Sequence, residues 1–337
     1  MAMRSGKDAS AVKPFVVVSS PEMHAMAQGV VDSIKRERNI DLPHYTVAFE
    51  RFKNGELLPR IAQTVRRQHV FFFQGMQMPS PNDGVMGALL MNDALRRASV
   101  AGITLVAPYL PYLWQDRKDQ PRAPISAKML ADVLGSNLSL ERVITADMHT
   151  DQAQGFFGIP VDNISCIKLF AHYAMNHIDC ISDCVMGSPD VGGVVRAERF
   201  GAASGSPLIA FCQKKRPAAN KSVTGATAGD KVEGRRVIMV DDMIDTGGST
   251  VGAAKKFMAD GATHVDVFAT HAIFSEGAEE RLSASGLRIF TTNSIPRPAN
   301  YAELHKKWLT IIPIEELLAE AVYQASLIGG SVSKLSA

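Results

Sequence analysis

The strongest chemical signal in the sequence is an acidic, glycine-rich segment, Val237–Thr250, which reads VIMVDDMIDTGGST. Its four leading apolar residues predict a buried strand, and Asp241 and Asp242 follow that strand at once. Glycines at the start of a helix let backbone N–H groups approach an anion closely, so the rest of the segment predicts a phosphate site. The residues that would form it are Asp245, Thr246, Gly247, Gly248, Ser249 and Thr250.

The two adjacent carboxylates that directly follow the predicted strand need a partner other than phosphate. Asp241 and Asp242 would repel an anion, whereas vicinal sugar hydroxyls or a hydrated Mg²⁺ suit them. A phosphate loop flanked by carboxylates therefore predicts a pentose phosphate as ligand. The alternative is a plain turn before a capped helix, which would need neither the acidic pair nor so many glycines and hydroxyls.

The same segment resembles the phosphoribosyl pyrophosphate binding loop shared by phosphoribosyltransferases and ribose-phosphate pyrophosphokinases. Four further segments resemble the pyrophosphokinases only, in family order from about residue 14 to the C-terminus. They are FKNGE at 52–56, PYLPYLWQDRKDQPRAPISAK at 108–128, ADMHTDQAQGFF at 146–157 and SPDVGGVVR at 188–196. The chain is thus identified as similar to the ribose-phosphate pyrophosphokinase family.

The resemblance implies an enzyme of nucleotide biosynthesis that uses Mg²⁺. It would move the β,γ-diphosphate of ATP to the 1-hydroxyl of ribose 5-phosphate, giving phosphoribosyl pyrophosphate and AMP. His149 and Asp190 match the family's metal ligands, and Asp190 would also lie beside the ribose 5-phosphate. Gly192, Gly193 and Arg196 match its pyrophosphate loop.

Lys214 and Arg216 match the family's catalytic basic pair. Diphosphate transfer gathers negative charge on phosphoryl oxygens, so catalysis would consist mainly of positioning and cationic stabilisation. These residues begin a polar stretch, residues 214–234, with almost no large apolar residue to bury. We expect this stretch to be a structureless lid that closes over the site, rather than a solvated surface loop.

Two segments match the ATP side of the family's site. Phe52, Asn54 and Glu56 lie on a hairpin that, in the family, reaches the adenine from a neighbouring subunit. The opposite wall and the metal side would be formed by Trp114, Gln115, Asp116, Arg117 and His149. The resemblance thus implies a homo-oligomer built on a dimer, with a tetramer or a hexamer as larger options. Trp114 stands where the family has Arg, and we expect its ring to stack on the adenine in place of that Arg.

The elements that position these residues alternate between short apolar strands and longer amphipathic helices, which predicts an α/β fold. The predicted strands are Phe15–Val18, Val70–Phe73, Ile103–Ala107, Val143–Thr145, Val185–Met186, Leu208–Phe211, Val237–Val240, Val265–Ala269 and Arg288–Phe290. The predicted helices are Glu22–Arg36, Gly84–Ser99, Ser126–Leu134, Ile167–Met175, Val194–Ala203, Ser249–Ala259, Gly277–Ala284 and Ile314–Ser326.

Together with the resemblance, this order predicts two phosphoribosyltransferase-like domains, each a mostly parallel sheet flanked by helices. We expect a disordered start at 1–13, an ATP-binding domain at 14–165, and a domain at 166–330 that carries the ribose 5-phosphate loop and the catalytic loop. A tail would occupy 331–337.

The amino-acid composition limits which binding partners and which cellular compartment are expected. The net charge of +2 over 337 residues gives no bias toward nucleic acid, and no apolar run approaches the ~20 residues of a membrane helix. Cys166, Cys180, Cys184 and Cys212 are too few for a disulfide scaffold, so a reducing, cytoplasmic setting is expected.

Three alternatives remain beside the pyrophosphokinase. A type I phosphoribosyltransferase would explain Asp241–Thr250 but would leave His149, Asp190 and the Lys214 and Arg216 pair without a role. A non-catalytic, synthetase-associated regulatory subunit would be expected to lose catalytic residues that stand here. A simple nucleotide-binding module would not need two different phosphate loops.

Overall fold

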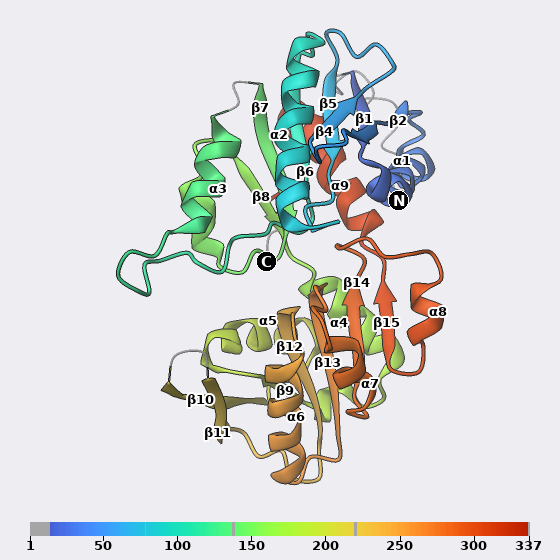
Figure 1. Cartoon of the computed structure of the whole chain (residues 1–337). Coiled ribbons are helices and arrows are strands. Elements are labelled where there is room, and N and C mark those ends of the chain that lie inside the picture. Colours follow the sequence, from blue (N-terminus) through green and yellow to red (C-terminus); the bar gives the residue numbers. More distant parts are fainter. Residues whose placement is uncertain (1–13, 78, 137–138, 219–220, 336–337) are drawn as a thin grey trace. The chain divides into compact units, whose positions relative to one another are not determined.

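The computed structural model of the chain (Figure 1) describes residues 14–77, 79–136, 139–218 and 221–335, and for residues 214–218 and 221–225 it describes the backbone only. The described residues form two compact units, 14–164 together with 314–335, and Ser165–Pro313. Within the described ranges, no helix is long and apolar enough to cross a membrane.

The first unit is built on a parallel sheet with the strand order β2-β1-β5-β6-β7-β8. Its strands are β1 (Phe15–Ser19), β2 (His44–Thr46), β5 (His69–Phe73), β6 (Gly102–Val106), β7 (Leu140–Ala146) and β8 (Val161–Ile164). A separate antiparallel hairpin joins β3 (Ala48–Arg51) to β4 (Leu57–Arg60). The helices are α1 (His24–Arg38), α2 (Pro81–Arg97), α3 (Ser126–Gly135) and α9 (Glu315–Ser326), with short 3-10 helices at Pro21–Met23 and Asp151–Phe156.

Both faces of this sheet are covered, which explains why every residue of β1 is buried. Side chains from alternate positions, such as Val16 and Phe72, pack with Met91 of α2 and Leu130 of α3. Figure 1 shows α2 in front of the sheet and α9 behind it. Burial on two faces is typical of a parallel sheet, and it accounts for the continuous apolar runs in the sequence.

The second unit has a sheet with the order β11-β10-β9-β12-β13-β14-β15, parallel except for the β10–β11 pair. Its strands are β9 (Val185–Ser188), β10 (Ile209–Ala218), β11 (Lys221–Gly229), β12 (Arg236–Ile244), β13 (His264–Ala272), β14 (Arg288–Thr292) and β15 (Leu309–Ile312). Its helices are α4 (Ile167–His177), α5 (Val194–Ser204), α6 (Gly248–Ala259), α7 (Ala278–Ser283) and α8 (Tyr301–His305), with 3-10 helices at Ile181–Asp183 and Val191–Gly193.

Phe268 of β13 shows how the second sheet is enclosed. Its ring lies 5.5 Å from Phe170 of α4 and 5.5 Å from Phe200 of α5, centroid to centroid. The adjacent Val267 belongs instead to the cluster that contains Phe257 of α6. Successive strand residues therefore face different helices, α4 and α5 on one side of the sheet and α6 on the other. The predicted α/β class, with mostly parallel sheets flanked by helices, is confirmed.

The prediction of a structureless stretch over residues 214–234 is wrong. The backbone of β10 continues to Ala218 and pairs antiparallel with β11, with Lys214 opposite Thr224 and Ala210 opposite Gly229. Residues that are polar on both faces give no alternating apolar pattern, so the sequence carried no strand signal there. The strands arise because β10 extends the edge of a sheet and β11 adds backbone hydrogen bonds to it.

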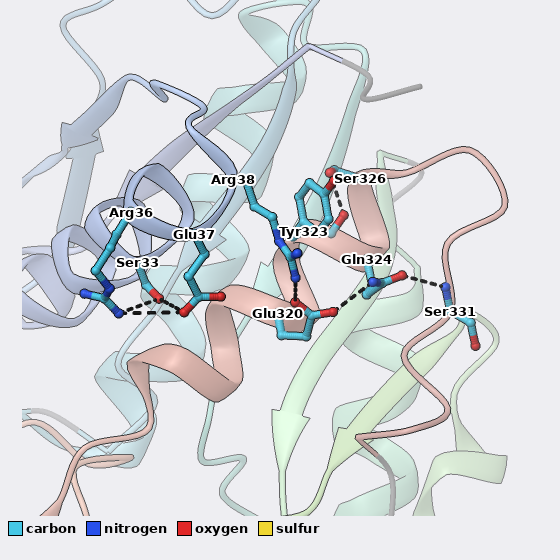
Figure 2. Close-up of polar contacts among 9 residues, drawn as sticks. All are labelled: Ser33, Arg36, Glu37, Arg38, Glu320, Tyr323, Gln324, Ser326 and Ser331. Carbon is cyan, nitrogen blue, oxygen red and sulfur yellow. Dashed lines mark hydrogen bonds and ion pairs between the residues drawn. The ribbon is translucent and has the colours of Figure 1, made fainter. Parts of the chain in front are cut away.

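The C-terminal helix also departs from prediction, because the second domain was expected to continue to residue 330. Instead α9 belongs to the first unit, where it packs against α1. Arg38 of α1 donates a 2.6 Å hydrogen bond to Glu320, and its guanidinium lies 4.7 Å from the centroid of the Tyr323 ring (Figure 2). Gln324 of α9 accepts from the backbone N–H of Ser331, which ties down the following segment. The apolar stripe of a helix does not indicate which sheet the helix covers, so the sequence could not show which unit α9 belongs to.

Candidate active site

The candidate site of the second unit lies at the carboxyl edge of its sheet. β9 and β12 are hydrogen-bonded neighbours, so Asp190, two residues after β9, comes close to the carboxylates of β12. Ligands of open parallel sheets bind at this edge. Asp241 and Asp242 lie within β12 rather than after it, because β13 runs on to Ala272 and keeps pairing with β12 as far as Ile244.

Among the described residues, Arg196 forms ion pairs with this carboxylate cluster. It lies in the first turn of α5, and its Nη1 is 3.5 Å from Oδ1 of Asp241 and 3.6 Å from Oδ1 of Asp242. These are ion-pair distances rather than short hydrogen bonds. Only 22% of the Arg196 side chain and 7% of the Asp242 side chain are exposed. One guanidinium thus offsets two adjacent, mostly buried carboxylates, a contact that the sequence did not predict.

The pKa of the Asp241 carboxyl differs from its ordinary value. Burial raises the pKa of its carboxyl well above the usual value, and the charges of Asp242 and Asp190 raise it further, while Arg196 opposes them. A carboxyl whose pKa is raised by folding binds protons more tightly in the native state. Its contribution to the unfolding free energy therefore falls as pH rises from about 4, the unfolded value, through the raised pKa.

We expect Asp241→Asn to become more stable, relative to the wild type, as pH rises from about 4 to 8, because asparagine stays neutral. Melting temperatures of both proteins across this range measure the effect. Asp260→Asn is a control of opposite sign, because hydrogen bonds from Lys256 and Thr227 lower the pKa of Asp260. Its stability deficit should stay nearly constant from pH 8 to about 4, the unfolded value, and shrink only at lower pH, so its melting temperature is followed below pH 4 as well. A melting-temperature difference for Asp241→Asn that does not change with pH would contradict the raised pKa.

The loop between β9 and α5 is tightly folded around Asp190. Oδ1 of Asp190 accepts a 3.2 Å hydrogen bond from the backbone N–H of Gly193, and the Ser188 hydroxyl donates to the Asp190 carbonyl at 2.6 Å. A Cβ at Gly193 would lie 2.5 Å from Oγ of Ser188, so a side chain has no room there. Gly192 is exposed. The predicted pyrophosphate loop is therefore compact at Gly193, whereas Gly192 is open to solvent.

The predicted phosphate loop follows β12 directly. Gly247 has a φ of 73°, a conformation that favours glycine, and α6 begins at Gly248. Thr246, Gly248 and Ser249 are exposed, whereas Gly247 and Thr250 are buried. The loop thus turns at a glycine and presents polar groups at a helix N-terminus, as an anion site requires.

The residues predicted for adenine lie in the first unit. The β3–β4 turn is closed by backbone hydrogen bonds from Phe52 N–H to Glu56 and from Gly55 N–H to Phe52. Oδ1 of Asn54 accepts from the N–H of Glu56, at 3.2 Å. Phe52 is 52% exposed, so its ring is accessible on the turn.

The second predicted ATP segment is the loop between β6 and α3. Trp114 in this loop is 48% exposed, Gln115 and Arg117 are also exposed, and Asp116 is half-buried. The Arg117 side chain donates to Asp119, which is in the same loop. Both aromatic rings predicted to face the base, those of Phe52 and Trp114, are therefore open to solvent on different elements of this unit.

The structure gives less information on the predicted metal ligands and on the predicted catalytic cations than on the two loops. His149 is exposed after β7 in the first unit, whereas Asp190 lies in the second. Within the part of the chain that the structure describes, no three His, Cys, Asp or Glu side chains form a group that could hold a metal ion. The side chains of Lys214 and Arg216 lie outside the described residues, although their backbone belongs to β10. Their roles stay predictions.

Two residues that contact the phosphate loop escaped prediction. The hydroxyl of Ser275 donates to the Asp245 carboxylate, and the guanidinium of Arg281 donates to the Thr246 carbonyl. Ser275 comes three residues after β13, the strand next to β12, and its polar side chain there was the only sequence signal.

Comparisons with known proteins agree with this arrangement. Residues 15–137 match the family model for the N-terminal domain of ribose phosphate pyrophosphokinase, and residues 206–335 match the phosphoribosyl synthetase-associated domain. A ribose-phosphate pyrophosphokinase of Vibrio vulnificus is 40% identical over 317 residues, which cover 94% of this chain and 96% of the relative. One of Vibrio cholerae is 41% identical over 319 residues, with the same coverage.

A solved structure extends the likeness to three dimensions. The phosphoribosylpyrophosphate synthetase of Mycobacterium smegmatis is 32% identical, with a TM-score of 0.77 over 93% of this chain and 99% of that chain. The two Vibrio relatives, at 40% and 41% identity over 96% of their own length, share more than a fold with this chain. The chain therefore belongs to the ribose-phosphate pyrophosphokinase family.

Proposed function

We propose that the chain transfers the β,γ-diphosphate of ATP to the 1-hydroxyl of ribose 5-phosphate, forming phosphoribosyl pyrophosphate and AMP. The observation that carries the proposal is the carboxylate pair Asp241 and Asp242, held by Arg196 between two tight glycine loops on neighbouring strands. Two loops of this kind suit two phosphate-bearing substrates. Carboxylates between them suit the hydroxyls of a sugar.

In this proposal the second unit binds the sugar phosphate. The N-terminus of α6 and the Thr246 and Ser249 hydroxyls would hold the 5-phosphate, while Asp241 and Asp242 would accept hydrogen bonds from ribose hydroxyls. The amides at Gly192 and Gly193 would contact the diphosphate. Lys214 and Arg216 would stabilise the charge that develops during transfer.

Mg²⁺ is part of the proposal. The Asp190 carboxylate has the oxygen donors that Mg²⁺ prefers, and the exposed His149 imidazole is an accessible ligand of the first unit. When bound, the ion would neutralise phosphate charge.

The adenine base of ATP would stack on the rings of Phe52 and Trp114. If the β3–β4 hairpin serves a neighbouring subunit, the active form is a homo-oligomer based on a dimer.

A cytoplasmic site of action belongs to the same proposal. All four cysteines are free thiols, three of them buried, which suits a reducing compartment.

The test is an incubation of purified protein with Mg²⁺, ATP and ribose 5-phosphate, followed by chromatography of the nucleotides. AMP that forms only with the sugar phosphate present, together with phosphoribosyl pyrophosphate, is the expected result. ADP in place of AMP would indicate single-phosphate transfer and contradict the proposal. No AMP from folded protein would favour the synthetase-associated subunit, and a search for its catalytic partner would follow.

Trp114→Ala is expected to weaken ATP binding about two- to tenfold, because an aromatic stack contributes about 0.5–1.5 kcal/mol. Trp114→Phe, which keeps a ring, should retain most of the affinity. Trp308, the other tryptophan, is only 8% exposed, so an ATP-dependent fluorescence change should come from Trp114. Unchanged ATP affinity and turnover in Trp114→Ala would rule out the stacking role.

A further inference from the structure

The segment that follows β13, residues 273–283, runs along the phosphate loop of the second unit. The backbone N–H groups of Ile273 and Phe274 both donate to the carbonyl of Ile244, at 3.0 and 3.1 Å. The N–H of Ser275 donates to the carbonyl of Asp245 at 3.2 Å. This segment, called the brace below, therefore follows the end of β12 into the loop.

Side chains of the brace contact each residue of the loop turn. Ser275 donates to the Asp245 carboxylate, and Arg281 of α7 donates to the Thr246 carbonyl. Leu282 lies under Gly247, where a Cβ would come within 3.1 Å of its methyl carbon. Asp245, Thr246 and Gly247 are thus each held by the brace and not only by their own strand and helix.

The brace itself is held in an uncommon conformation. Phe274 has a φ of 49°, in the left-handed region that aromatic residues rarely adopt. Its ring packs against Trp308, at 5.8 Å between centroids, and Arg297 lies 5.6 Å over it. Arg297 in turn donates to the carbonyls of Ala272 and Ile273, at 2.6 and 2.8 Å. Such a backbone persists only where its surroundings impose it, so the position of Ser275 is set by the core of the unit.

The contact with Arg281 determines how one peptide group is oriented. In a trans peptide, the C=O and the following N–H point in opposite directions. Arg281 binds the Thr246 carbonyl, so the N–H of Gly247 is turned away from α7. Ser275 meanwhile donates to the one carboxylate of the turn, which keeps that negative charge engaged within the protein.

We propose that Ser275 and Arg281 are positioning residues for the sugar-phosphate end of the reaction. They hold the carbonyl and carboxylate groups of the loop turn on the side of the brace, and so leave its N–H groups to the anion. The inference rests on the proposed function, in which this loop binds the 5-phosphate of ribose 5-phosphate. The residues need not touch the substrate themselves.

The decisive measurement is the KM of each substrate in Arg281→Ala. We expect the KM for ribose 5-phosphate to rise about tenfold, which corresponds to about 1.4 kcal/mol. The KM for ATP should stay within about twofold and kcat within about threefold, because the diphosphate loop is untouched. Arg281→Lys keeps a donor near Thr246 and should recover part of the loss. Ser275→Ala should raise the same KM by a smaller factor.

Arg288→Ala is the matched control. Arg288 donates to Asp266 through two hydrogen bonds, at 2.8 and 2.7 Å, at the amino ends of β13 and β14. Its loss should lower the melting temperature without changing the KM for ribose 5-phosphate. An equal rise in this KM for Arg288→Ala and Arg281→Ala would reduce the effect to general destabilisation and overturn the inference. So would an unchanged KM in Arg281→Ala.

Calorimetric titration with ribose 5-phosphate separates this inference from the proposed function. If the wild type binds the sugar phosphate and forms no AMP, the proposed reaction fails, and an approximately tenfold weaker binding by Arg281→Ala still supports the positioning role. If the wild type forms AMP and Arg281→Ala binds the sugar phosphate as tightly as the wild type, the positioning role fails and the reaction stands.

Discussion

Arg196→Ala is expected to lower kcat/KM for ribose 5-phosphate about a hundredfold. Removing one partner of a buried ion pair costs about 3–5 kcal/mol, and the Arg196 guanidinium lies within ion-pair distance of both Asp241 and Asp242. Without it, two adjacent carboxylates with Asp190 nearby would repel both phosphate-bearing substrates. A loss of about 2.7 kcal/mol in transition-state binding corresponds to that hundredfold change.

The pH profile gives this prediction a second readout. Arg196 lowers the pKa of Asp241 against burial and the charge of Asp242. Its removal should therefore shift the acid limb of the activity profile to higher pH, since more of the Asp241 carboxyl is then protonated. Arg196→Lys, which keeps the charge but not the planar fork, should show a smaller loss and a smaller shift.

Arg199→Ala provides the control on the same helix. Arg199 is exposed and lies one turn further along α5. Its removal takes away a positive charge of this helix but leaves Arg196 beside Asp241 and Asp242. Activity of this variant should stay within about twofold of the wild type. An Arg196→Ala enzyme that keeps more than a tenth of wild-type activity would show that the carboxylate pair does not depend on Arg196.

Gly193→Ala is expected to reduce diphosphate transfer about ten- to a hundredfold. The added Cβ would lie 2.5 Å from Oγ of Ser188, a fully buried hydroxyl that donates to the carbonyl of Asp190. Overpacking of this kind costs about 1–3 kcal/mol, and a displacement of about 1 Å at a reacting group can cost about a hundredfold in rate. Because Asp190 accepts a hydrogen bond from the N–H of Gly193, a shift of Gly193 would also move Asp190, at the other end of the loop.

A second substitution tests whether the clash is the cause. Ser188→Ala removes Oγ and leaves a Cβ at 3.6 Å from the new methyl group, an ordinary contact. The double variant should therefore be more active than Gly193→Ala, although Ser188→Ala by itself loses a hydrogen bond. Gly158→Ala, where a Cβ would meet no atom within 4 Å, should be neutral. A double variant that is less active than Gly193→Ala would contradict the steric explanation.

The order of elements and the chemistry of the loops could be predicted from the sequence. Apolar runs such as Val70–Phe73 are buried on both faces of a parallel sheet, and a strand of this kind reads as one continuous apolar segment. The segment from Val237 to Thr250 combines a buried strand, a pair of adjacent carboxylates and a glycine turn within fourteen residues. Those are local features, so the residue order by itself determines them.

Pairings between distant residues were decided by the tertiary structure. Arg196 and Asp241 are 45 residues apart, and Arg281 and Thr246 are 35 apart. Each pair meets only because parallel strands bring their carboxyl ends to one edge. The polar β10–β11 hairpin and the placement of α9 likewise depend on a sheet edge and a sheet face. Periodicity reports which face of an element is apolar, whereas only the assembled sheet determines what that face contacts.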